Sequence, residues 1–184
     1  MNKFGTKGDG LSTRFTIVFC IIGIVGAILM IASIYVVWVE IDILGFTIGS
    51  LTGWEIYSEY SDLFELHNAI LPPISLICGI LVLMIMIIVL LDDDDKYRKL
   101  NIALGLITSI LAVFMLIYAY YVTQKTWEVM SFTVHLYNYL RIGFWMTVTG
   151  SVIAFLGGFI PFLKNVKDQK ELASDDSSDI TPIE

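Results

Sequence analysis

The sequence predicts an all-α membrane protein: a four-transmembrane-helix bundle with a small extracellular β-hairpin or sheet from two outer loops. The prediction depends on four long apolar stretches, on the absence of charged residues and histidine from all four, and on alternating patterns between them. A helix needs about 20 apolar residues to cross the bilayer core of about 30 Å. Each stretch reaches that length, and in order they are residues 15–39, 69–91, 100–122 and 142–163.

The length of the chain bounds its domain organisation. With 184 residues, of which 57% are hydrophobic, it has room for the helices, two outer loops and short tails, but not for a separate soluble domain. We expect an N-terminal lead over residues 1–14, a membrane domain over 15–166 with outer loops at 40–68 and 123–141, and a disordered acidic tail over 167–184.

The positive charges predict the orientation. Nine of the eleven Lys and Arg residues precede the first helix, lie between the second and third, or follow the fourth, and none lies in residues 40–68. Because Lys and Arg collect in cytoplasmic loops, we expect both termini on the cytoplasmic side of the plasma membrane and the two longer loops outside. The first apolar stretch is longer than the core of roughly 7–15 residues in a cleavable signal, so we interpret it as a retained anchor.

The first outer loop carries a strand pattern. Val37 to Ile43 alternates apolar and polar side chains, which is typical of a strand. Leu44 and Gly45 offer a turn, so that Phe46 to Leu51 can return as a second strand of a hairpin. A short amphipathic helix is then expected from Trp54 to about His67.

The second outer loop also alternates between Thr126 and Tyr137 and is rich in β-branched and aromatic residues. Because two strands alone are marginal in water, we expect this segment to add a strand to the first hairpin and form a small sheet.

Small residues recur within the apolar stretches at the spacing that lets helices approach closely in lipid. Packing within one bundle is our first interpretation of them, and contact between copies is the second. The helix-packing candidates are Gly23, Ala27, Gly105, Ser109, Gly150, Ala154 and Gly158. Aromatic residues of the outer loops suit the level of the lipid headgroups. The candidate interaction or interface anchors are Trp38, Gly53, Trp54 and Trp127.

The inventory for catalysis or metal binding is thin. Glu55, Glu59 and Asp62 would share one helical face and could hold Ca²⁺ or Mg²⁺, although a solvated acidic face explains them as well. His67 and His135 are the two histidines, and neither lies in a metal-ligand motif. We therefore expect no catalytic residue, no metal, no cofactor and no enzyme activity.

The order of the parts resembles a known organisation. A first helix ends in Trp38, an outer hairpin closes on Gly53 and Trp54, and a last helix opens with Gly143. This order is similar to that of claudin-like tetraspans, although the pair of loop cysteines typical of claudins is absent. The chain looks closer to small four-helix membrane proteins of archaea and bacteria. That resemblance implies a fold and a membrane location, but no activity.

These observations predict a non-enzymatic tetraspan, a structural, accessory or interaction subunit whose outer loops bind a partner. The expected partners are the lipid bilayer and a membrane protein or second copy, with no nucleic acid. The alternative is a small oligomeric channel or transporter component with hydroxyl groups along its pore. Hydroxyls on one water-accessible stripe would favour permeation, and burial between helices would favour structure. The hydroxyl residues concerned are Ser33, Thr108, Ser109, Thr147, Thr149 and Ser151.

Overall fold

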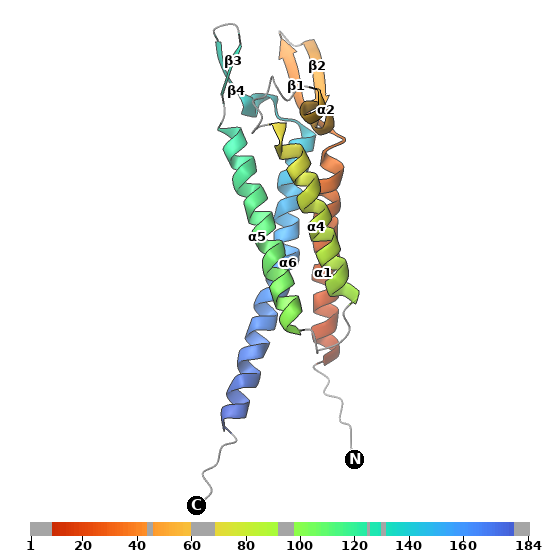
Figure 1. Ribbon diagram of the computed structural model, residues 1–184, viewed down its shortest axis with the longest axis vertical. Helices are drawn as coiled ribbons and strands as arrows, with labels where there is room; N and C mark the ends of the chain where they lie inside the picture. Colours follow the sequence, from red (N-terminus) through yellow and green to blue (C-terminus); the bar gives the residue numbers. More distant parts are fainter. Residues whose placement is uncertain are drawn as a thin grey trace, which may run out of the picture.

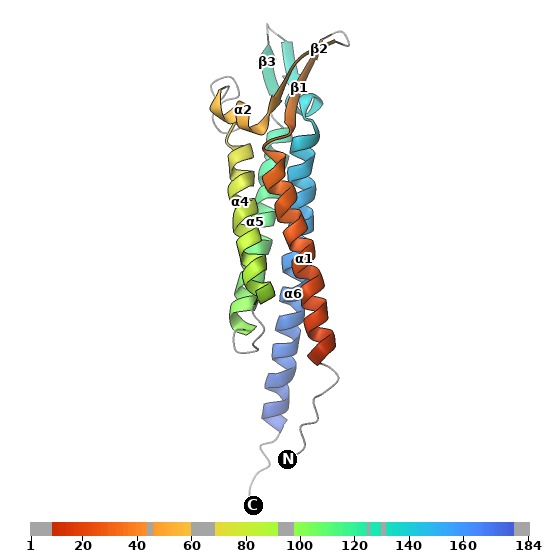
Figure 2. The same ribbon diagram turned by 90° about the vertical axis from the view of Figure 1, so that its right-hand side faces the viewer.

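Four long helices lie side by side in a bundle, with strands and one short helix gathered at one end (Figure 1). We call this end the hairpin end. Helix α1 begins and helix α6 ends toward the opposite end, which we call the tail end (Figures 1 and 2). The computed structural model describes residues 9–43, 46–59, 69–91, 98–124, 126–129 and 132–178.

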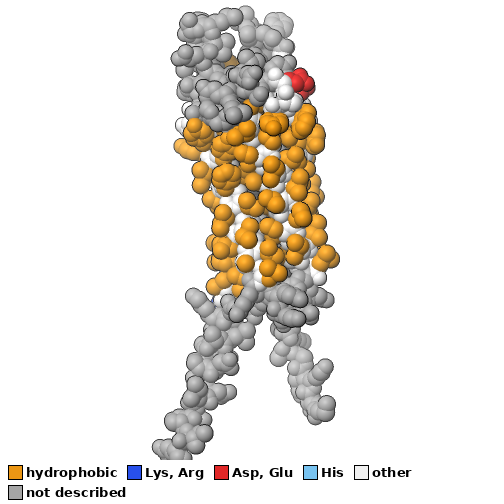
Figure 3. Space-filling model, in the orientation of Figure 1, with side chains coloured by type: hydrophobic (Ala, Val, Ile, Leu, Met, Phe, Trp, Pro, Cys, Tyr) orange, Lys and Arg blue, Asp and Glu red, His pale blue; other side chains and the backbone are white. Residues whose placement is uncertain are grey.

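The four-helix architecture predicted from the sequence is confirmed. The long helices are α1 (Asp9–Ser33), α4 (Leu71–Leu91), α5 (Arg98–Thr123) and α6 (Ile142–Ser178). Their apolar parts are 19, 21, 24 and 26 residues long, so each is long and apolar enough to cross a membrane. Apolar side chains cover the visible face of the bundle between its two ends (Figure 3).

Helix α1 ends at Ser33 and not at residue 39, where the apolar stretch ends. The Ser33 hydroxyl donates to the Met30 carbonyl at 2.7 Å, inside the last turn of the helix. The Ile34 carbonyl accepts the Trp54 N–H at 2.9 Å, a bond to a distant part of the chain. The Ile34 carbonyl is therefore bonded to a residue of the hairpin end and not to the next turn of a helix. Beyond it the chain continues as strand β1.

The predicted hairpin is present. Strand β1 (Val37–Ile43) pairs antiparallel with β2 (Phe46–Thr52), and the register shifts at two places along β1. The second alternating segment forms a hairpin of its own, β3 (Thr126–Val129) with β4 (Phe132–His135), and does not add a strand to the first. A single bridge between Val39 and Leu140 links β1 to the residues just before α6, so the two segments meet without forming one sheet.

A short helix, α2 (Gly53–Ser58), follows β2 and lies beside the hairpin end of α4 (Figure 2). Thr52 and Glu55 form a capping box at its start, because each side chain accepts the other residue's backbone N–H. The expected continuation of this helix to His67 lies outside the described residues.

Helix α6 continues beyond the apolar part of the chain to Ser178. We expected disorder from residue 167, and the structure has helix instead over 167–178. All but one of residues 167–173 are Lys, Gln, Glu, Leu or Ala, which are strong helix formers, and the segment extends a helix that has already formed. Residues 179–184 lie outside the described part of the chain.

The closest helix contact joins α1 to α6 through small residues. A Cβ atom on Gly157 would lie 2.5 Å from the Cα of Gly23, and one on Gly26 would lie 2.6 Å from the Gly150 carbonyl oxygen. Only the absence of side chains allows the backbones to approach this closely. Ala27 of α1 is fully buried.

A second contact of this kind joins α5 to α6. A Cβ atom on Gly105 would lie 3.0 Å from the Gly158 carbonyl oxygen. The Ser109 hydroxyl donates to the Gly105 carbonyl within α5 at 2.8 Å, and Ala154 of α6 is fully buried. All seven helix-packing candidates therefore lie in contacts within the bundle.

Candidate interaction site at the hairpin end

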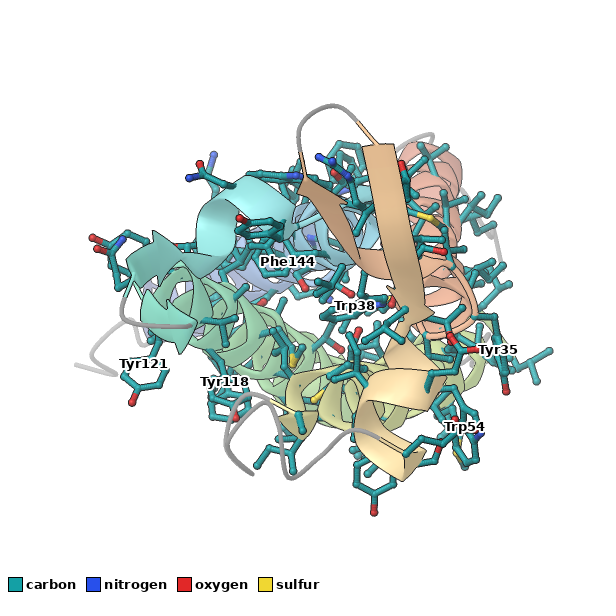
Figure 4. The ribbon with its side chains drawn as sticks, turned by 90° about the horizontal axis from the view of Figure 1, so that it is seen from above. Tyr35, Trp38, Trp54, Tyr118, Tyr121 and Phe144 are labelled. Carbon is teal, nitrogen blue, oxygen red and sulfur yellow. The ribbon has the colours of Figure 1, made fainter. Side chains whose placement is uncertain are left out.

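Trp38 lies at the centre of the hairpin end, above the bundle axis (Figure 4). Only 2% of its surface is exposed, and its indole N–H donates to the Ser33 carbonyl at 2.6 Å. A Cβ atom on Gly53 would lie 2.7 Å from the indole nitrogen, and one on Gly143 would also collide with the ring. These two positions are therefore limited to glycine while the indole occupies its site.

The indole of Trp38 is also held from α6. The ring of Phe144 meets it edge to face, with 6.0 Å between the centroids and 83° between the planes. Such pairs stabilise by roughly 0.5–1.5 kcal/mol beyond the area they bury. Phe144 itself is 1% exposed. Trp38 thus connects β1 to α1, α2 and α6. We expected Trp38 in an aromatic belt at the level of the lipid headgroups, and in the structure its side chain is buried.

A cluster of three hydroxyls lies in the bundle near Trp38, one from each of α1, α4 and α6. Thr147 donates to the Ser33 hydroxyl at 2.8 Å, and the hydroxyls of Thr147 and Ser75 are 3.1 Å apart. Ser75 also donates to the Met30 carbonyl at 3.2 Å. All three side chains are fully buried. The cluster links three helices through hydrogen bonds that are shielded from solvent inside the bundle.

An ion pair joins β1 to the start of α6. The Arg141 Nε lies 2.6 Å from a carboxylate oxygen of Glu40, and each side chain is about one-third exposed, at 35% and 31%. The Arg141 backbone N–H donates to the Trp38 carbonyl at 2.8 Å. A partly exposed pair contributes up to about 1 kcal/mol, so its main effect is to fix the register between β1 and α6.

The carboxylate of Glu55 is held at the start of α2. It accepts the Thr52 backbone N–H at 2.8 Å and the Thr52 hydroxyl at 2.9 Å. These bonds favour the ionised form and lower the pKa of Glu55 below its ordinary value. Glu55 therefore has a structural role in the capping box.

Aromatic side chains point outward around Trp38. Trp54 and Tyr57 of α2 are 50% and 41% exposed, and the centroids of their rings are 6.4 Å apart. Tyr35, in the turn before β1, is exposed on the same side as Trp54 (Figure 4). The belt of aromatic residues at the level of the lipid headgroups stays a prediction for these side chains. Trp127 lies in β3, and its side chain is outside the described part of the structure.

No family model, curated protein or solved structure matches this chain. Claudin-like similarity is therefore not found, and the four apolar helices alone connect the chain to tetraspans.

Only some of the candidate metal and catalytic residues lie in the described part of the chain. Among the residues that the structure describes, no three His, Cys, Asp or Glu side chains come together. Glu55 and Glu59 are in or just after α2, whereas Asp62 and His67 lie outside the described range. His135 is the last residue of β4.

Sequence reasoning missed two features of this end. Ser75 was not among our hydroxyl candidates, although Ser33, Ser75 and Thr147 all lie within two turns of the hairpin end of their helices. The similar depth of these three residues along their helices was the available signal. The sequence did not show how each helix is rotated, and so which of its faces meets the other helices. The pairing of Glu40 with Arg141 joins residues 101 positions apart, and nothing local indicates it.

Proposed function

We propose that the protein is an integral membrane tetraspan without enzyme activity, an accessory or interaction subunit. It binds a partner membrane protein or a second copy of itself through the hairpin end. The burial of Trp38 carries this proposal. Its indole is hydrogen-bonded to α1 and packed on α2 and α6, so β1 has a fixed position. A preorganised surface loses less entropy when a partner binds.

The membrane location is part of the same proposal. Four helices of sufficient length and an apolar outer surface support it. The distribution of Lys and Arg supports a multi-pass arrangement in the plasma membrane, with both termini in the cytoplasm and the hairpin end outside.

The hydroxyl groups support a structural role over a pore. Ser33, Thr147 and Ser151 are fully buried, and Thr108 and Ser109 are buried between α5 and its neighbours. Of the six candidates only Thr149 faces outward. A water-filled path would require these groups to line an accessible surface.

The test is extraction into nanodiscs at native expression level, followed by mass measurement of the intact particle. We expect a stoichiometric partner or a defined homo-oligomer. Trp54→Ala at the hairpin end should reduce the fraction of the protein found in that complex. Phe114→Ala on α5, which is similarly exposed at 49%, is the matched control and should leave it intact. A monomer without a partner would contradict the proposal, and ion flux through purified protein would favour the channel alternative.

A further inference from the structure

Strand β2 has one paired edge and one open edge. Phe46–Thr52 pairs with β1 on one side, and among the described residues no strand pairs with its other side. In an antiparallel strand, successive residues direct their N–H and C=O groups to alternate sides. The open edge of β2 therefore presents a row of backbone donors and acceptors to any extended chain that reaches it.

The opposite edge of the hairpin is covered. On that side β1 forms the bridge from Val39 to Leu140, and the Trp38 carbonyl accepts the Arg141 N–H at 2.8 Å. The two edges of this hairpin thus differ, and β2 is the one available for pairing.

Strand edges in other proteins are often protected by proline, by charged residues or by bulges, and of these β2 shows only the two register shifts in its pairing with β1. Its sequence, FTIGSLT, contains no proline and no charged residue. A Cβ atom on Gly49 would meet nothing within 4 Å, and Thr47 and Ser50 are exposed. An incoming strand would therefore meet small or polar side chains along much of this edge.

A third strand would stabilise the hairpin. Two strands alone are marginal in water, and three are usually needed for independent stability. Trp38 and the pair of Glu40 with Arg141 already hold β1 in place, so adding a strand orders little of this chain.

The sequence of the segment that contains β2 is acidic, which indicates the chemistry of the partner. Residues 37–68 contain six carboxylates and no Lys or Arg, and the nearby Arg141 already pairs with Glu40. One acidic patch is visible at the side of this end, next to the apolar surface (Figure 3). A second copy would bring the same carboxylates and be repelled, whereas a basic segment would be attracted.

We propose that the open edge of β2 accepts an extended segment of a partner protein as a third strand. The segment has alternating β-branched residues flanked by Lys or Arg. This inference rests on the proposed interaction function and names the surface and the chemistry of the partner.

The test uses the full chain in nanodiscs and two synthetic peptides, Lys-Thr-Val-Thr-Val-Thr-Val-Lys and the same sequence with Glu at both ends. We expect the basic peptide to bind about tenfold more tightly than the acidic one and to slow amide exchange in β2. Replacing its central Val by Pro should abolish binding, because Pro removes a ladder donor.

A matched pair of variants separates strand pairing from simple charge attraction. Ser50→Lys places a charge on β2, and Ser58→Lys adds the same charge on exposed α2. Ser50→Lys should weaken binding several-fold more than Ser58→Lys. Equal weakening, binding of the Pro peptide, or unchanged amide exchange in β2 would overturn the inference. If Ser50→Lys leaves capture of a native partner intact, the interaction function stands and this site for it is wrong.

Discussion

At the scale of single residues, Trp38 determines how the hairpin end is assembled. Its side chain is bonded to α1, packed by glycines that begin α2 and lie in the first turn of α6, and covered by Phe144. Trp38 therefore joins β1 to three helices at this end. The effect of changing it should therefore be larger than that of changing an exposed tryptophan.

We predict that Trp38→Phe lowers the free energy of unfolding by about 1–3 kcal/mol, because it removes the bond to the Ser33 carbonyl and leaves a cavity beside Gly53 and Gly143. Reversible unfolding by dodecyl sulfate in mixed micelles measures this. Trp54→Phe is the control, since Trp54 is 50% exposed, and it should change the free energy by less than about 0.5 kcal/mol. Equal effects of the two changes would show that the indole of Trp38 is not held as described.

The sequence predicted which residues are small or aromatic at this end, but not their partners. Trp38 follows an apolar helix and precedes polar residues, as an interfacial anchor does, so nothing in its neighbourhood indicated burial. Gly143 opens the last helix in the sequence pattern, yet its contact with Trp38 depends on how α6 meets β1. Contacts between residues about a hundred positions apart depend on how the elements pack. The periodicity of apolar residues along the sequence does not predict that packing.

At the scale of elements, α2 depends on its capping box. The depressed pKa of Glu55 means that the folded state favours the carboxylate, so the box contributes stability above the unfolded pKa of about 4.3 and loses it as the pH falls through the folded pKa. We predict that the protection factors of the α2 amides, which correct for the pH dependence of the intrinsic exchange rate, fall on acidification through this range, and that they do not fall in Glu55→Gln.

Carbon-detected titration of the Glu55 carboxyl group gives an independent check. Thr52→Val removes the hydroxyl donor and keeps the backbone N–H, so it should raise the pKa of Glu55 part of the way to its ordinary value. A pKa that does not move in Thr52→Val would show that the hydroxyl does not contribute.

The contact of α1 with α6 depends on glycine at Gly157. We predict that Gly157→Leu destabilises the protein by at least about 1–3 kcal/mol, because the new side chain would enter the backbone of α1 at Gly23. Val152→Leu, on the exposed side of α6, adds volume without this collision and should have little effect. Unfolding in mixed micelles compares the two variants. Similar stabilities would contradict the close approach.

Element types were predictable, and several boundaries were not. Apolar length predicted the four helices, and alternation predicted β1 with β2. The apolar pattern continues past Ser33 without a break, so the end of α1 depends on a tertiary hydrogen bond from Trp54. The extension of α6 to Ser178 was missed because we gave more weight to its acidic composition than to its strong helix formers.

For the whole molecule, the orientation can be tested by labelling introduced cysteines, because the two native cysteines are buried. Cys20 and Cys78 are 1% and 5% exposed, so they should react slowly with aqueous reagents. We predict that a membrane-impermeant maleimide added to intact cells labels Ser50→Cys at the hairpin end and spares Lys167→Cys at the tail end. Lysis should expose the second site. Labelling of Lys167→Cys in intact cells would reverse the proposed orientation.

The Ser33–Thr147 hydrogen bond connects residues 114 positions apart and has a consequence for biosynthesis. The ribosome completes α1, β1 and α4 long before α6, so for most of synthesis Trp38 has no Phe144 beside it and Ser33 no Thr147. The hairpin end can close only after the last helix has been synthesised. A truncated or stalled chain would therefore display an open hairpin end, which quality-control factors could recognise as unfinished.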